Sequence, residues 1–202
     1  GVLIGTYADT FTGFNYIWLG LDAIGGWETM SGYIDNISVS QPVTFSEDWE
    51  EDIQTDKWQI YGSPVPEVYE GVGVDSSKAI DNNGDGYHSS GVYSTTQFDL
   101  DTGLTLEYWL KGTGATGTTY AGVFLGFNDC DINGTEGDLQ SCEQYPVMIR
   151  ATAEDNEVSY HAIGSTPFVE EWSPLNDIWH HFKIVVHSNG LVDFYRDDVL
   201  QL

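Results

Sequence analysis

Basic side chains are scarce in this chain of 202 residues. Six lysines and arginines stand against 32 aspartates and glutamates, which gives a formal net charge of −26 at pH 7. This balance excludes nucleic acid as a partner, because its phosphates must be neutralised by Lys and Arg. So few cations also leave most carboxylates without an ion-pair partner, and the resulting self-repulsion destabilises a compact chain. We therefore expect divalent cations or high salt to screen the charge.

Long apolar runs are missing as well. The most apolar run, residues 16–21, has the length of a strand and is far shorter than the roughly 20 residues of a membrane-spanning helix. We therefore expect no membrane span. The chain begins at Gly1 without an initiator Met or a basic-then-apolar leader, so we expect either that a secretion signal was removed or that the chain starts inside a longer polypeptide.

Cysteine is limited to Cys130 and Cys142, which bracket a polar loop that contains glycine. A disulfide between them would stabilise the fold by about 3 kcal/mol, whereas the alternative is two unpaired thiols. We predict the disulfide because the rest of the chain has a secreted character. Two Asn-x-Ser/Thr motifs, at Asn36 and Asn133, are candidate glycosylation sites and fit an extracellular location, although such short motifs also arise by chance.

Helix signals are nearly absent, whereas Gly, Thr, Tyr and Val recur throughout the sequence. Apolar residues alternate with mixed ones over residues 104–110 and 178–186, and Ser188-Asn189-Gly190 predicts a tight turn into a strand over 191–196. We predict one all-β domain built as a two-sheet antiparallel sandwich. The other expected strands cover residues 16–21, 33–39, 43–49, 91–98, 121–127, 147–151 and 158–163.

Several segments resemble the concanavalin A-like and laminin-G-like jelly rolls. The resemblance is spread over residues 43–202 and does not rest on one sharp motif. The segments are FSEDWE at 45–50 with Lys57-Trp58, DNNGDG at 81–86 through GVYS at 91–94 and FDL at 98–100, GLTLEYW at 103–109, WHHFKIVV at 179–186 and GLVDFYRD at 190–197. The resemblance implies a jelly-roll fold.

The segment YIDNISV at 33–39 resembles the last strand of these domains, yet it lies near the start of this chain. We therefore predict that residues 1–40 are terminal strands that complete a jelly-roll body over 41–202. In a permuted geometry, 33–39 turns back through Gln41-Pro42 and pairs with 43–49 of the same chain. In an exchanged geometry, some or all of residues 1–40 complete a neighbouring subunit. We expect exchange for residues 2–21, which would join copies head to tail into a filament unless the contacts close into a ring.

Calcium is the predicted ligand of two acidic loops. Alternating oxygen-bearing residues followed by glycine are typical of calcium loops. The first loop is not an EF-hand, because its twelfth position is Val92 and an EF-hand has a glutamate there. An ordinary Asn/Asp/Gly turn is the alternative in each case. The expected ligands are Asp81, Asn83 and Asp85 in the first loop, and Asp129, Asp131, Asn133 and Glu136 in the second.

A third calcium position follows from the resemblance alone. Similar jelly rolls hold a structural calcium between an acidic residue of the first strand and an aspartate of the last. Asp48 or Glu50 and Asp35 occupy those positions here. The alternative for Asp35 is an edge-strand carboxylate that faces water.

Patterns that indicate catalysis are missing. The chain has no nucleophile elbow, and the paired glutamates of the sugar-cleaving members of this fold have no counterpart with the right spacing. We therefore expect a non-catalytic structural or adhesive module of an extracellular or cell-surface protein. The alternative function is a lectin-like carbohydrate-binding module, in which Trp27 and Trp172 stack on sugar rings.

Overall fold

The computed structural model describes residues 14–23, 29–41, 44–62, 65–81, 90–116, 119–126, 147–152, 157–162, 168–170, 177–197 and 199–200. Within these ranges the chain is mostly antiparallel β-structure, which confirms the all-β prediction. Two single turns of 3-10 helix, η1 (Val74–Ser76) and η2 (Leu100–Thr102), are the only helical elements of the described part. None of its helices is long and apolar enough to span a membrane.

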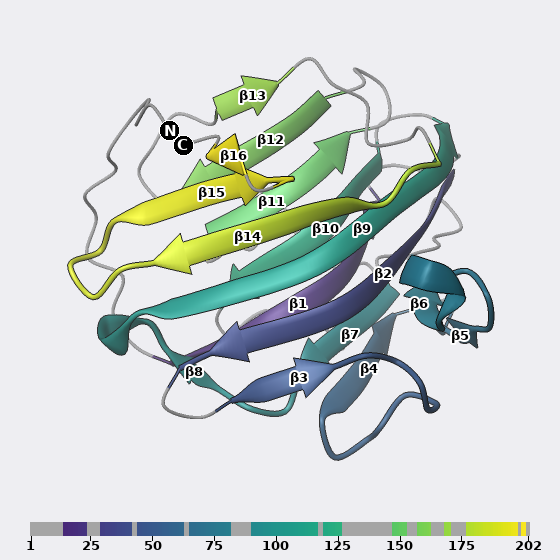
Figure 1. The fold of residues 1–202 in the computed structure, drawn as a ribbon, viewed down its shortest axis with the longest axis horizontal. Coiled ribbons are helices and arrows are strands. Elements are labelled where there is room, and N and C mark those ends of the chain that lie inside the picture. The colour runs from purple at the N-terminus through teal and green to yellow at the C-terminus, as the bar shows by residue number, and fades with distance from the viewer. Residues whose placement is uncertain are drawn as a thin grey trace.

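The strands form two sheets that lie in layers (Figure 1). Sheet 1 has the order β13 (Phe168–Glu170), β12 (Glu157–Ala162), β11 (Val147–Thr152), β10 (Thr119–Gly126), β1 (Phe14–Ala23), β7 (Ser90–Ser94) and β4 (Trp58–Gly62), with β8 (Phe98–Asp99) also on β1. Sheet 2 has the order β16 (Val199–Leu200), β15 (Val192–Arg196), β14 (His180–Val186), β9 (Leu104–Thr116), β2 (Thr29–Ser40), β6 (Ala79–Asp81) and β5 (Val68–Tyr69), with β3 (Phe45–Glu47) also on β2.

Alternating side chains from both sheets build one core. In β14 the buried positions are Phe182, Ile184 and Val186, two residues apart, as expected for a strand with one face on the core. The hairpin between β14 and β15, predicted from the Ser188-Asn189-Gly190 turn, is confirmed. Ile17 and Leu19 of β1 belong to the same buried cluster, so the core lies between the sheets.

The N-terminal strands lie inside the sheets of their own chain. β1 pairs with β10 on one side and with β7 on the other, and β2 lies between β9 and the pair β3 and β6. Residues 37–39 pair with residues 45–47, as in the permuted geometry. Because a strand donated by a neighbour would occupy the same place, exchange of residues 2–21 between subunits stays a prediction.

Strand β2 contains an irregularity that shapes the site. Asp35 is opposite Trp109 of β9, and the next paired residue, Ser38, is opposite Glu107. Two residues of β2 therefore oppose one of β9, which is a β-bulge. Asn36 has φ of +49° there, in the left-handed region that asparagine tolerates better than most residues.

Candidate metal centre

Asp35 is a completely buried carboxyl on the outward-facing side of β2. Its neighbours along the strand, Ile34 and Ile37, are 1% exposed and belong to the core. The segment from Gly73 to Lys78, which contains η1, covers Asp35 and reduces its exposure to 0%. A carboxyl group can remain in such a place only when hydrogen bonds, a cation or a proton compensate for the lost water.

Three donors surround the carboxyl group. The backbone N–H of Asn36 donates to Oδ1 over 2.7 Å, and the backbone N–H of Val74 donates to Oδ2 over 2.8 Å. The hydroxyl of Ser77 lies 2.9 Å from Oδ2. Burial nevertheless raises the pKa of Asp35 above its ordinary value of 3.8, since desolvation outweighs these hydrogen bonds, and the negative charge of Glu50 adds to the increase.

The oxygen atoms beside Asp35 outnumber the hydrogens available to them. The Ser77 hydroxyl lies 2.6 Å from the carbonyl oxygen of Val74 and 2.9 Å from Asp35 Oδ2, but it has only one hydrogen to donate. One of these close oxygen pairs therefore shares the Ser77 hydrogen, or is relieved by a proton on Asp35 or by a cation nearby. Burial, which raises the pKa of Asp35, favours the same proton or cation, because both relieve a buried negative charge.

Gly73 lets these oxygens pack closely against its backbone, because it has no side chain. Its φ of −72° and ψ of −177° suit any residue, so backbone conformation does not require glycine. A Cβ atom there would lie 2.4 Å from the Lys78 carbonyl oxygen, 2.4 Å from Ser77 Oγ and 2.7 Å from Asp35 Oδ2. We call these three groups the cradle: a carboxylate, a hydroxyl and a carbonyl that pack against the Gly73 backbone and are the kinds of oxygen that calcium prefers as ligands.

Glu50, which is exposed, places a second carboxylate beside the cradle. Its Oε1 accepts a hydrogen bond from the backbone N–H of Lys78 over 3.1 Å, and its charge acts on Asp35. Asp48, the alternative ligand from the sequence, is exposed, and its Oδ1 accepts the N–H of Glu50 over 3.2 Å. Among the described residues, no three Asp, Glu, His or Cys side chains gather as a metal site. The cradle and Glu50 therefore offer only two carboxylates, and an ion there would depend on hydroxyl and carbonyl oxygens.

The predicted loop ligands are described only in part. Asp81 is 8% exposed at the end of β6, where its Oδ1 accepts the N–H of Glu67 over 2.7 Å and its own N–H donates to the Glu67 carbonyl over 2.9 Å. Asn36, the first candidate glycosylation site, has an exposed side chain on the bulge. The other predicted residues lie outside the described ranges: Asn83, Asp85, Asp129, Asp131, Asn133, Glu136, Cys130, Cys142, Trp27 and Trp172.

Glu47 is a buried carboxylate that sequence reasoning missed. It is 3% exposed and accepts three hydrogen bonds, from the backbone N–H of Trp49 over 3.1 Å, from the indole N–H of Trp58 over 3.1 Å and from Lys57 Nζ over 3.3 Å. Phe45, Glu47 and Trp49 are alternate residues and all three are buried. This alternation in FSEDW was the available signal that Glu47 faces inward.

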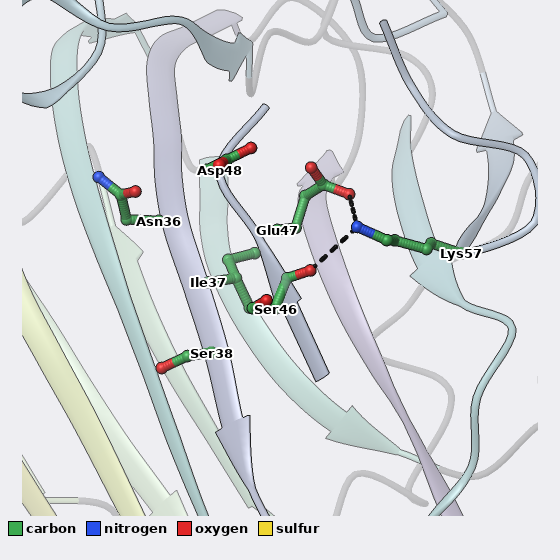
Figure 2. A pocket seen from close by; sticks show the side chains of 7 residues that line it. All are labelled: Asn36, Ile37, Ser38, Ser46, Glu47, Asp48 and Lys57. Atoms are coloured by element: carbon green, nitrogen blue, oxygen red, sulfur yellow. Dashed lines mark hydrogen bonds and ion pairs between the residues drawn. The ribbon is translucent and has the colours of Figure 1, made fainter. Parts of the chain in front are cut away.

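A polar cleft of about 360 Å³ lies beside Glu47. Its lining consists of Asn36, Ile37, Ser38, Ser46, Glu47, Asp48 and Lys57. In Figure 2, Lys57 reaches Ser46 and Glu47 from one side, whereas Asn36 and Ser38 point to the other side. Because these polar groups do not converge, the cleft does not present a common set of donors and acceptors to one small ligand.

Comparisons with protein-family models, with curated proteins and with solved structures give no match to this chain.

Proposed function

We propose that this chain is a calcium-stabilised, non-catalytic structural or adhesive module with a jelly-roll sandwich fold, carried by an extracellular or cell-surface protein. The observation that carries the proposal is the oxygen cradle around the buried carboxyl of Asp35, in which the absence of a side chain at Gly73 lets the oxygens approach one another and Glu50 adds a nearby negative charge. The net charge of −26, with only six basic residues, gives the chain a further need for cations.

Calcium would contribute to stability rather than to chemistry in this proposal. Asp35 belongs to β2, Glu50 follows β3, and Ser77 and Lys78 belong to the segment before β6. These residues are far apart in sequence, so a shared ion would fasten the segment Gly73–Lys78 onto sheet 2. An ion that binds only the folded state stabilises that state in proportion to the logarithm of its concentration.

The test is calcium titration followed by thermal unfolding of the wild type and of Asp35→Asn, which keeps the size of the side chain but removes its charge. For the wild type we expect about 2.7 kcal/mol of stabilisation at a calcium concentration of 100 times the Kd. Asp35→Asn should lose most of this effect. The matched control is Asp101→Asn, which removes one charge at an exposed position outside the cradle and should keep the effect.

Low ionic strength is needed in this test, because salt would screen the surface charge in place of calcium. A wild-type melting temperature that is the same in chelator and in calcium would contradict the proposal. Equal calcium effects in Asp35→Asn and the wild type would instead place the ion elsewhere, and would contradict the Asp35 cradle as its site.

A further inference from the structure

Strand β3 lies at an open edge of sheet 2. Its three residues pair with β2, and within the described ranges no strand pairs with its other side. The carbonyl group of Ser46, the middle residue, points away from β2 and toward Lys57 (Figure 2). Unpaired backbone groups at such an edge are a template for pairing with a strand of another molecule.

Lys57 covers this edge. Its ammonium group donates to the Ser46 carbonyl oxygen over 3.1 Å and to Glu47 Oε2 over 3.3 Å. The backbone of Lys57 is itself fixed, because its N–H donates to the Gln54 carbonyl over 3.0 Å and its carbonyl accepts the N–H of Thr95 over 2.8 Å. The side chain therefore starts from a defined turn and ends on the backbone of β3.

Glu47 fixes the position of the ammonium group. Its carboxylate side chain is 2% exposed and is also held by the indole N–H of Trp58, whose ring stacks on Trp49 at 5.3 Å between centroids. A carboxylate enclosed in this way has little freedom to move. The Lys57 side chain is 34% exposed, so its ammonium group stands between the edge and the solvent.

We propose that Lys57 guards the β3 edge against a second copy of this chain. The N–H and carbonyl of one residue point to the same side of an antiparallel strand, so the Ser46 N–H also points away from β2. Without the Lys57 ammonium group, both groups would be free to pair with the same groups of another β3. Such pairing would be antiparallel, because a strand edge that meets itself across a two-fold axis is self-complementary, and it would give a closed dimer rather than a filament. Inward-placed charges and lysines on edge strands have this protective effect in natural sheets.

The test compares two lysine variants that are matched in charge and exposure. Lys57→Met removes the ammonium group and keeps an apolar stem, and Lys183→Met does the same at a 35% exposed lysine that lies 3.3 Å from Glu107. Lys183 belongs to β14, which is paired on both sides. Sedimentation velocity in about 1 M NaCl, where the Debye length is about 3 Å, removes most of the repulsion between copies.

We expect Lys57→Met to dimerise with an association constant at least about tenfold above those of the wild type and Lys183→Met, a factor that corresponds to about 1.4 kcal/mol. Adding Ser46→Pro should return Lys57→Met to a monomer, because proline removes the outward N–H. Equal association constants for all the proteins would overturn the proposal, and so would dimers of Lys57→Met that persist with Ser46→Pro.

A destabilised variant can also associate through partly unfolded chains, so Glu47→Gln serves as the stability control. It weakens the hold on the ammonium group and lowers stability, but it leaves the Ser46 carbonyl within reach of Lys57. We expect this variant to unfold at a lower temperature and to stay monomeric. Dimerisation of Glu47→Gln to the same extent as Lys57→Met would attribute the association to instability and overturn the guard role.

Discussion

Replacing Gly73 with alanine separates the effect of space from the effect of backbone conformation. The φ of −72° at this position is one that alanine adopts freely, and a glycine-to-alanine change at a compatible site stabilises a protein by about 0.4–1 kcal/mol through the unfolded state. The new methyl group would lie 2.4 Å from the Lys78 carbonyl oxygen, which belongs to the backbone and cannot rotate away. Overpacking of this kind costs about 1–3 kcal/mol.

The two effects combine to a net destabilisation of about 0–2.6 kcal/mol. The middle of this range, about 1.3 kcal/mol, lowers the melting temperature of a domain of this size by roughly 3–5 °C. Far-UV circular dichroism during heating, in chelator and in calcium, measures both the loss and the calcium effect. We expect Gly73→Ala to lose the calcium effect as well, since its methyl group would push apart the Lys78, Ser77 and Asp35 oxygens.

The matched control is Gly71→Asn. Gly71 has φ of +72° with no atom within 4 Å of an added Cβ, and asparagine tolerates this conformation. We expect a change of a few tenths of a kcal/mol and an intact calcium effect. A Gly73→Ala protein that is more stable than the wild type would refute the reasoning, because the entropic gain would then be the whole effect and the cradle would not be tight.

Two further predictions concern Asp35 and β1. In chelator, the free energy of unfolding should fall as pH rises above about 3.8 and through the raised pKa of Asp35, because the folded state then holds a proton that the unfolded chain has lost. Urea unfolding between about pH 3.5 and about 7 measures this dependence. An equal slope of unfolding free energy against pH in Asp35→Asn would contradict the prediction. A cysteine pair at Leu21 and Ser90, which are register partners, should form an intramolecular disulfide in dilute protein, whereas a ladder of covalent oligomers on a non-reducing gel would reveal strand exchange between subunits.

Alternation and turn chemistry in the sequence were sufficient to predict one hairpin of sheet 2. The pattern over 178–196 contains a strand, a turn and a strand that are neighbours in the chain, so local information specifies the β14–β15 hairpin. Pairs between distant strands were harder to predict in both sheets. β1 pairs with β10 and β7, about 100 and 70 residues away along the chain, and β9 pairs with β2 and β14, each about 75 residues away, and no local pattern indicates such partners.

The candidate site was predictable in its carboxylates but not in its other oxygens. Resemblance to jelly rolls pointed to Asp35 together with Asp48 or Glu50, and the structure brings Asp35 and Glu50 to the segment Gly73–Lys78. The carbonyl oxygen of Lys78 could not be predicted, because every residue has a backbone carbonyl and its use depends on the tertiary fold. The calcium itself and the loop ligands stay predictions.

The bulge in β2 shows which residue of this strand is an insertion. With Asn36 removed, Ile34, Asp35, Ile37, Ser38 and Val39 would form a regular alternation, with the three apolar residues facing the core and the two polar residues facing outward. Packing of the sheet therefore needs one residue fewer than the strand contains. The extra residue is the one whose N–H donates to Asp35 Oδ1 over 2.7 Å, so the added length of the strand serves the buried carboxyl rather than the core.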